Sequence, residues 1–340
     1  MIPLNQSGSA KPNDLDRVGI VVIGRNEGLR LVKCLESLPE SVAVVYVDSG
    51  STDDSIEQAL RLRATVVYLD LTTAFTAARA RNMGWRKLLE LSPHITFVQF
   101  IDGDCELFDG WLTRAQEFLQ AQPQVAVVGG RRREREPNAS IYNALCDMEW
   151  DTPIGQALAC GGDAMMRAEC LVAVDGYRDD LIAGEEPELC LRLRTAGWQV
   201  WRLDHEMTLH DAAIHRFGQW WSRTTRGGFA FAQGAWLHGA PPHRHWVAET
   251  RRAIIWGGVL PAIIVLCCAF YGFKALALFV IYPLQVARVA LRSSVNTAGS
   301  VTRLKRSAFF ILGRFPECIG AFKFYVSRLR NRSTTIIEYK

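Results

Sequence analysis

The chain has 340 residues, of which 49% are hydrophobic, and a formal net charge of +4. The charge is unevenly distributed: residues 251–340 carry 14 of the 39 basic and 2 of the 35 acidic side chains, so residues 1–250 carry 25 and 33. The acidic N-terminal part argues against nucleic acid as a partner. The basic, apolar C-terminal part indicates contact with anionic membrane lipid.

Residues 1–17 contain neither an apolar run nor a cleavage site, so we expect a flexible tail ahead of a domain that stays in the cytoplasm. Nine cysteines without Cys-x-x-Cys spacing fit buried thiols in a reducing compartment better than a zinc site.

Short runs rich in Val and Ile then alternate with amphipathic stretches. We expect strands over residues 18–24, 42–48, 64–70, 95–102 and 125–131. We expect helices over residues 29–38, 53–63, 76–91 and 111–121. This alternation, with strands that are nearly continuously apolar, predicts an α/β fold with a mainly parallel sheet covered on both faces.

In such a sheet, ligands bind beyond the carboxyl ends of the strands. Polar loops follow three of the expected strands: "GRNEG" at 24–28, "DSGSTDDS" at 48–55 and "DGD" at 102–104. Ser51 fits an N-cap for the next helix. The two aspartates of "DGD" fit either a turn or a pair of oxygen ligands for a divalent cation. Because the three loops meet at one edge of the sheet, the cation is the better interpretation.

These segments, in this order and spacing, resemble the family 2 glycosyltransferases, which are nucleotide-sugar-dependent enzymes with the Rossmann-like GT-A fold. The resemblance covers roughly residues 18–233 and implies a GT-A domain over residues 18–240. It implies donor-binding roles for Arg25, Asn26, Glu27, Asp48, Gly50, Asp53, Arg79, Arg81, Asn82 and Asp102. It also implies a bound Mg²⁺ or Mn²⁺ with Asp102, Asp104 and His210 as ligands, and Asp211 as an alternative to His210.

Residues 160–177 resemble the acceptor-side strand and helix of the family, and residues 184–198 resemble the segment that holds its catalytic base. Family members usually have Glu-Asp-x-Asp-Leu there, whereas this chain has Glu-Glu-Pro-Glu-Leu at 185–189. By register Glu186 is the expected base and Glu185 the second choice; alternatively both are first-turn acids of a helix with Pro187 at position N1. The expected acceptor-side residues are Gly161, Gly162, Asp163, Glu188, Arg223 and Arg226.

The chemistry of sugar transfer requires both a bound cation and a catalytic base. A cation stabilises the departing nucleoside diphosphate, and one carboxylate accepts the proton of the attacking hydroxyl, best when neighbouring acids raise its pKa. A single base and in-line attack imply inversion at the anomeric carbon.

Residues 253–273 contain no charge and are long enough to cross a bilayer, and residues 275–287 continue the apolar run. Basic residues on both flanks place those flanks in the cytoplasm. We expect a hairpin over residues 251–291 that spans the membrane, or is re-entrant or shallow because its second half is short and contains Pro283. Residues 300–340 are expected to form a basic amphipathic interfacial segment, with an ordinary packed helix as the alternative.

The sequence therefore predicts an enzyme of the cytoplasmic membrane that transfers one sugar from a UDP- or related NDP-sugar to a lipid-linked or glycan acceptor, in cell-envelope polysaccharide biosynthesis. One alternative is a polyprenyl-phosphate glycosyltransferase similar to dolichyl-phosphate-mannose synthase, whose phosphate acceptor needs no general base. Another is a catalytically silent nucleotide-binding membrane scaffold. Nothing in the sequence indicates an oligomeric state.

Overall fold

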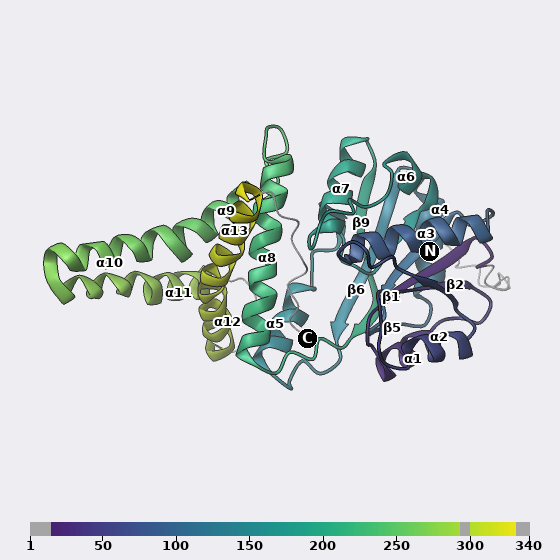
Figure 1. The fold of residues 1–340 in the computed structure, drawn as a ribbon, viewed down its shortest axis with the longest axis horizontal. Coiled ribbons are helices and arrows are strands. Elements are labelled where there is room, and N and C mark those ends of the chain that lie inside the picture. Colours follow the sequence, from purple (N-terminus) through teal and green to yellow (C-terminus); the bar gives the residue numbers. More distant parts are fainter. Residues whose placement is uncertain (1–14, 293–299, 331–340) are drawn as a thin grey trace, which may run out of the picture. The chain divides into compact units, whose positions relative to one another are not determined.

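The computed structural model describes residues 15–292 and 300–330 (Figure 1). The described residues form two compact units that interleave along the chain. Unit 1 comprises residues 15–135, 147–179 and 186–212, and unit 2 comprises residues 136–146, 180–185, 213–292 and 300–330. Residues 1–14 of the expected tail and residues 331–340 of the expected basic segment lie outside the described residues.

Unit 1 is built on one sheet, which has nine strands among the described residues in the order β3-β2-β1-β4-β8-β6-β9-β5, with β7 paired to β9. The strands are β1 (Val18–Gly24), β2 (Ala43–Asp48), β3 (Thr65–Tyr68), β4 (Phe97–Asp102), β5 (Cys105–Leu107), β6 (Val125–Glu134), β7 (Gly155–Ala157), β8 (Ala164–Arg167) and β9 (Gln199–His210).

The first four strands pair in parallel, as the sequence predicts. β6 and β9 are also parallel, whereas β8 runs antiparallel to β4 and β6, and β5 and β7 run antiparallel to β9. The sheet is therefore mixed beyond β4.

Helices cover both faces of the sheet, which confirms the predicted architecture. One core contains side chains of α1 (Leu29–Glu36), α2 (Ser55–Arg61) and α4 (Trp111–Ala121). The other contains side chains of α3 (Ala77–Leu91), α6 (Ala168–Ala173) and α7 (Glu185–Thr195). The residues of β1 alternate between them: Ile20 and Val22 join the first core, and Val21 and Ile23 join the second. This alternation follows from the period of two along a strand.

Close approach of α3 to the sheet depends on Gly84. A Cβ atom at this position would lie 2.3 Å from Cγ1 of Val21 and 3.1 Å from Cγ2 of Val47. We expect Gly84→Ala to lower the free energy of unfolding by about 1–3 kcal/mol, because overpacking must shift these β-branched side chains or the helix. Urea unfolding of the detergent-solubilised protein, followed by tryptophan fluorescence, measures the change.

A matched control is Gly227, a helical glycine at which an added Cβ has no neighbour within 4 Å. Gly227→Ala should leave stability unchanged or raise it by up to about 1 kcal/mol through better helix propensity. Equal stability of Gly84→Ala and wild type would contradict the packing described for α3.

Unit 2 is helical among its described residues. It contains most of α5 (Ile141–Glu149), α8 (Phe217–His238), α9 (Val247–Ile254), α10 (Leu260–Tyr271), α11 (Ile281–Arg292), α12 (Ser300–Leu312) and α13 (Arg314–Leu329). Its core joins Ile182, Phe229 and Ala232 to Ala321 and Phe324 of α13.

Glycines bring α8 and α13 close together. A Cβ on Gly228 would lie 2.1 Å from the carbonyl oxygen of Glu317, and one on Gly320 would lie 2.0 Å from that of Thr225. The face of α13 opposite this contact leaves Phe322 and Leu329 exposed. The helix begins at Arg314, and Pro316 is its third residue. It thus combines a packed face with an exposed apolar face.

The apolar segment Val247–Arg292 is long and apolar enough to cross a membrane, and only 11% of its most apolar window is buried. A π-helical stretch (Ile255–Val259) leads into α10, and a 3-10 helix (Gly272–Val280) joins α10 to α11. The chain reverses there, since the Tyr282 hydroxyl donates to the Trp256 carbonyl at 2.6 Å. Figure 1 shows α10 and α11 side by side, extending away from the rest of unit 2.

Candidate active site

The three polar loops lie at one edge of the sheet in unit 1. In the register of β1 with its neighbours, Gly24 pairs with Asp48 of β2 and Ile23 pairs with Asp102 of β4. The carboxyl ends of these parallel strands therefore coincide, as the sequence predicts, and side chains far apart along the chain converge there.

The loop after β2 is organised by Asp48, which is buried. One carboxylate oxygen accepts hydrogen bonds from the backbone N–H groups of Gly50 and Ser51, both at 2.9 Å, and the other accepts from the Tyr46 hydroxyl at 3.1 Å. Burial, with the nearby Asp48 charge, raises the pKa of Tyr46, so this hydroxyl stays a donor. Asp48 and Gly50 thus shape the loop on which the family resemblance places the nucleobase.

Hydrogen bonds of Asn26 connect the loop after β1 to the loop after β2. Its side-chain oxygen accepts a hydrogen bond from the Thr52 backbone N–H at 2.7 Å, and its backbone N–H donates to the Ser51 hydroxyl at 2.9 Å. The predicted cap role of Ser51 is wrong: α2 begins only at Ser55, after Asp54, and the Ser51 hydroxyl serves Asn26 instead. Asp53 accepts from the backbone N–H of Ser55 at 3.1 Å.

The two remaining residues of the first loop contact neighbouring groups. Arg25 is exposed and its guanidinium lies 4.6 Å from the centre of the Phe75 ring, a cation–π contact. Glu27 forms an ion pair with Arg30 at 2.8 Å. Arg25 and Phe75 belong to loops at the same sheet edge, so the pair is available to a ligand bound there.

The residues of α3 that were predicted to bind the nucleotide-sugar donor make different contacts. The Arg79 guanidinium donates to backbone carbonyls of the loop that precedes the helix, including Asp70 at 2.8 Å. The Asn82 amide is buried and makes four hydrogen bonds, two to the backbone of Tyr177 and one each to Trp85 and Asp179. These bonds use the whole capacity of the amide, so Asn82 supports the site from within the core.

Arg81, next to Asn82, joins two of the predicted site carboxylates. Its side chain is almost fully buried and lies 2.7 Å from Asp102 and 3.0 Å from Glu186. Gly162 packs against this trio: an added Cβ would lie 2.6 Å from Arg81 Nη2 and 3.2 Å from Glu186 Oε1. The structure therefore brings the end of β4, the start of α7 and Gly162 together around one guanidinium. Gly161, beside it, has open space at its Cα.

Arg132 is a second, partly buried cation at the site, and the sequence did not predict it. It lies 3.3 Å from Asp102 and 3.4 Å from Asp163, and its guanidinium stacks 4.9 Å from the Trp150 ring. Asp163 is fully buried, accepts from the Asp102 N–H at 3.0 Å and from the Thr208 hydroxyl at 2.7 Å, and so fixes the end of β4. The predicted strand ended at residue 131, whereas β6 continues to Glu134 and carries Arg132 into the site.

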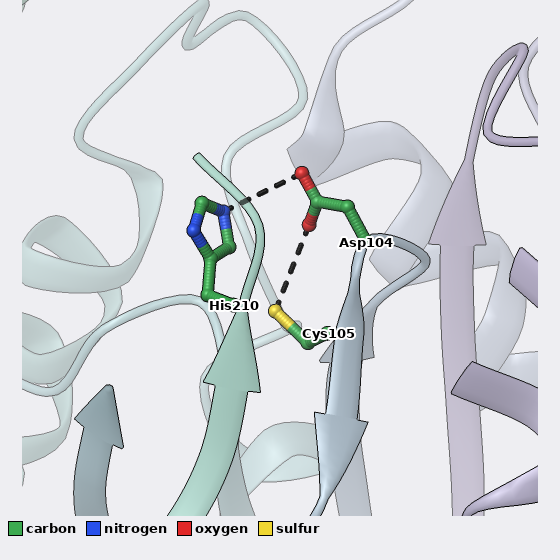
Figure 2. Close-up of side chains that lie close together, drawn as sticks. All are labelled: Asp104, Cys105 and His210. Carbon is green, nitrogen blue, oxygen red and sulfur yellow. Dashed lines mark hydrogen bonds and ion pairs between the residues drawn. The ribbon is translucent and has the colours of Figure 1, made fainter. Parts of the chain in front are cut away.

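The candidate metal centre joins the turn after β4 to the end of β9 (Figure 2). Nε2 of His210 lies 3.4 Å from Oδ2 of Asp104, and both side chains are buried. This separation exceeds the usual N–H···O distance of about 2.9–3.0 Å and suits two ligands of one cation. Burial, reinforced by the Arg132 charge, lowers the pKa of His210, so the ring is neutral near pH 7 and can act as a ligand. These residues therefore fit the divalent cation that the resemblance implies.

Helix α7 carries the three predicted glutamates. It begins at Glu185, so Pro187 is the third helical residue and not the first, as one interpretation of the sequence had it. Glu186 pairs with Arg81, and Glu188 pairs with Arg192 at 2.9 Å. Two of the three neighbouring acids thus have cationic partners. Glu185 is buried.

The two predicted acceptor-side arginines lie on α8 in unit 2. Nε of Arg226 donates to the Ile182 carbonyl at 3.2 Å, within the same unit. Arg223 lies about one turn earlier in the helix and is half-buried.

Removing the guanidinium that joins Asp102 and Glu186 should destabilise unit 1. We expect Arg81→Met to lower the free energy of unfolding by about 3 kcal/mol, because it removes the cation that Asp102 and Glu186 share and leaves only Arg132 beside Asp102. On the same helix, Arg86 pairs at 3.0 Å with the exposed Asp175, and Arg86→Met should change stability by less than about 1 kcal/mol. Urea unfolding of both variants measures the difference, and equal effects would contradict a structural role for Arg81.

The fold has a counterpart among solved structures. The chain superposes on a solved mannosyltransferase, PcManGT from Pyrobaculum calidifontis in complex with GDP-Man and Mn²⁺, with a TM-score of 0.63 and 20% identity over 91% of this chain and 87% of that one. This likeness shows a GT-A fold. Residues 19–164 match the family described as "Glycosyl transferase family 2". The matched segment contains β1 to β4 and the three polar loops of the candidate site, so this part of the chain is similar to a glycosyltransferase family 2 domain.

Two curated proteins are similar in sequence. The succinoglycan biosynthesis protein ExoA of Rhizobium meliloti (strain 1021) is 27% identical over 201 residues, which are 54% of this chain and 60% of that protein. The glycosyltransferase AglE of Haloferax volcanii is 25% identical over 197 residues, 54% of this chain and 63% of that protein. The match thus spans less than two thirds of either relative.

Proposed function

We propose that the enzyme transfers a single sugar, with inversion, from a UDP- or related NDP-sugar to a lipid-linked or glycan acceptor at the cytoplasmic face of the membrane, and that it requires a divalent cation. The observation that carries this proposal is the convergence, at one edge of the unit 1 sheet, of the Asp104–His210 pair and the Asp102–Arg81–Glu186 chain of ion pairs. The Asp104–His210 pair suits a cation that binds the diphosphate. The Asp102–Arg81–Glu186 chain contains a carboxylate that is suited to proton transfer.

Glu186 is the proposed general base. The acceptor oxygen bonds to the anomeric carbon as the bond from that carbon to the diphosphate oxygen breaks, and the hydroxyl proton passes to Glu186 while the nucleoside diphosphate leaves with the bonding electrons. The Arg81 guanidinium, 3.0 Å away, fixes the orientation of this carboxylate. Gly162 leaves room beside this carboxylate, because any side chain there would meet it.

Asp104 and His210 are the proposed protein ligands of the cation, with Asp102 adjacent. A bound Mg²⁺ or Mn²⁺ would neutralise charge that develops on the departing diphosphate. Asp104 contributes a carboxylate, the ligand that both ions favour, and His210 contributes a neutral imidazole. Arg132, held by Asp102 and Asp163, adds a fixed positive charge close to the same place.

Membrane association is proposed from unit 2. Its apolar segment exposes large side chains, including Phe270, Tyr271, Phe273 and Leu284, which lipid would cover at a gain of about 25 cal/mol per Å². Arg251, Arg252 and Arg292 lie near its two ends, and by the positive-inside rule both ends of the hairpin face the cytoplasm. The names of the two curated relatives, one from succinoglycan biosynthesis, support a glycan or lipid-linked glycan as the acceptor.

The test is a donor screen with the full chain purified in detergent. A panel of nucleotide sugars is incubated with lipid-linked and soluble glycan acceptors, with Mn²⁺ or with EDTA, and released nucleoside diphosphate and glycosylated product are measured. We expect one donor to give equimolar diphosphate and singly glycosylated product of inverted configuration, with Mn²⁺ only. Turnover that persists in EDTA would contradict the metal role, and absence of turnover with every donor would contradict the proposed transfer.

A further inference from the structure

The thiol of Cys105 lies inside the candidate metal centre, although sequence reasoning treated it only as a buried core residue. Its Sγ atom, with one ligand atom each from Asp104 and His210, forms a group in which all atoms lie within 4.8 Å of one another. It belongs equally to a second group with Asp102 and Asp163. Figure 2 shows the sulfur directed toward the Asp104 carboxylate, on the same side as the imidazole.

The distances agree with a tetrahedral centre. Bond lengths of about 2.3 Å to sulfur and about 2.0–2.1 Å to nitrogen and oxygen place tetrahedral O and S ligands about 3.5 Å apart and O and N ligands about 3.3 Å apart. Sγ of Cys105 lies 3.6 Å from Oδ1 of Asp104, and Nε2 of His210 lies 3.4 Å from Oδ2. These two distances run to different oxygens of the Asp104 carboxylate, and one ligand atom from each of the three side chains lies within 4.8 Å of the others, so small side-chain movements would bring all three to one ion.

We propose that Cys105 is a third protein ligand for borderline-soft cations, so that the Asp104–Cys105–His210 group binds Zn²⁺, Co²⁺ or Cd²⁺ in preference to Mg²⁺. This inference rests on the proposed function only in taking Asp104 and His210 as the ligands of the activating cation. Thiolate sulfur selects such ions, whereas Mg²⁺ and Mn²⁺ prefer oxygen ligands.

Coordination by three side chains leaves one open tetrahedral position. That position accepts one phosphate oxygen, whereas an octahedral Mg²⁺ or Mn²⁺ held by Asp104 and His210 keeps more positions for a diphosphate. We therefore expect Zn²⁺ to displace Mn²⁺ and to reduce turnover.

The surroundings of the thiol argue against a freely reactive cysteine. Cys105 is fully buried, and burial raises its pKa well above the ordinary value, opposed in part by the positive charge of Arg132, whose Nη2 lies 3.3 Å from the sulfur. Without a cation the thiol keeps its proton and donates to Asp104. A coordinated thiol is deprotonated outright, so its proton passes to solvent when the ion binds.

Cobalt provides a readout that does not depend on catalysis, because a thiolate bound to Co²⁺ gives an intense charge-transfer absorption in the near ultraviolet. The purified full chain, reduced and stripped of metal, is titrated with Co²⁺. We expect one equivalent to develop this band in wild type, and Zn²⁺ to abolish it. Cys105→Ser and Cys105→Ala should lack the band and bind Co²⁺ roughly 10–100-fold more weakly, the range seen when a supporting group of a metal site is removed.

Eight other cysteines require a control. Cys170 is also buried in unit 1 but belongs to neither ligand group, so Cys170→Ser should keep the wild-type band. Circular dichroism and the thermal midpoint establish that each variant is folded, and the serine variant preserves a donor to Asp104 should the alanine variant unfold.

A wild-type protein without the thiolate band, or a folded Cys105 variant that keeps it, would overturn the inference. The donor screen with Mn²⁺ separates this failure from failure of the proposed function. Wild type that releases nucleoside diphosphate but shows no band refutes the role of Cys105 alone. Wild type that shows the band but releases no diphosphate with any donor refutes sugar transfer alone.

Discussion

Asp104→Asn is expected to reduce kcat/KM for sugar transfer by about 100-fold or more at saturating Mn²⁺. Asparagine preserves the shape of the side chain but removes the negative charge that is proposed to hold the cation beside His210. Metal ions contribute several kcal/mol of transition-state stabilisation, and about 2.7 kcal/mol corresponds to 100-fold. Initial rates of nucleoside diphosphate release, measured across a Mn²⁺ titration, give the change.

Asp109 provides the matched control, since it is an exposed aspartate five residues later. Asp109→Asn should retain wild-type kcat/KM and Mn²⁺ dependence. If Asp104→Asn kept wild-type turnover with unchanged Mn²⁺ dependence, the cation would lie elsewhere and the site would need another explanation.

The second large effect is expected for Glu186→Gln, which should lower kcat by about 10²–10⁴-fold, the usual contribution of a positioned general base. Glutamine still offers a carbonyl oxygen to Arg81, so the fold and donor KM should change little. The comparison variant is Glu185→Gln, which alters the adjacent acid and should leave kcat within a few-fold. Steady-state kinetics with a hydroxyl acceptor give both values.

Full turnover of Glu186→Gln would favour the polyprenyl-phosphate alternative, because a phosphate acceptor already carries the nucleophilic charge. A large loss in Glu185→Gln, with Glu186→Gln unaffected, would move the base one residue along α7. Glu90→Gln, a change at an exposed acid paired with Lys87, controls for the loss of a negative charge as such.

The sequence was sufficient to predict the first half of the sheet. Val18–Gly24 and Trp111–Ala121 were predicted to the residue, because β1 is continuously apolar and α4 keeps one apolar face. The antiparallel placement of β8 and the length of β9 were not predicted. β9 mixes charged and apolar residues, and its conformation depends on pairing with β5, β6 and β7, contacts that are distant in sequence.

The sequence predicted which residues belong to the site better than it predicted the contacts that they make. The sequence placed Asp102, Asp104 and His210 at one metal. The structure brings Asp104 and His210 together, whereas Asp102 pairs with Arg81 and Arg132 and belongs to a separate group of potential ligands. The sequence also gave Arg81 and Asn82 the same role, but neighbours on a helix point about 100° apart. Arg81 therefore reaches Asp102 and Glu186, while Asn82 faces the backbone of Tyr177.

No sequence motif indicated that Arg132 and Cys105 belong to the candidate site. An arginine near a strand end and a cysteine after an aspartate are common in any core. Their importance arises only when β6, β5 and β9 align side by side and place both residues against the aspartates of the loop after β4.

The central claim is that the acids closing β4 hold a divalent cation against a bound diphosphate. Its most direct test is a crystal of the full chain grown with Mn²⁺ and the nucleoside diphosphate identified by the donor screen, with data collected for anomalous scattering from manganese. We predict one strong anomalous peak within coordination distance of Asp104, His210 and diphosphate oxygens. A peak bound only by phosphate and solvent, or no peak beside Asp104 with the nucleotide in place, would contradict the account.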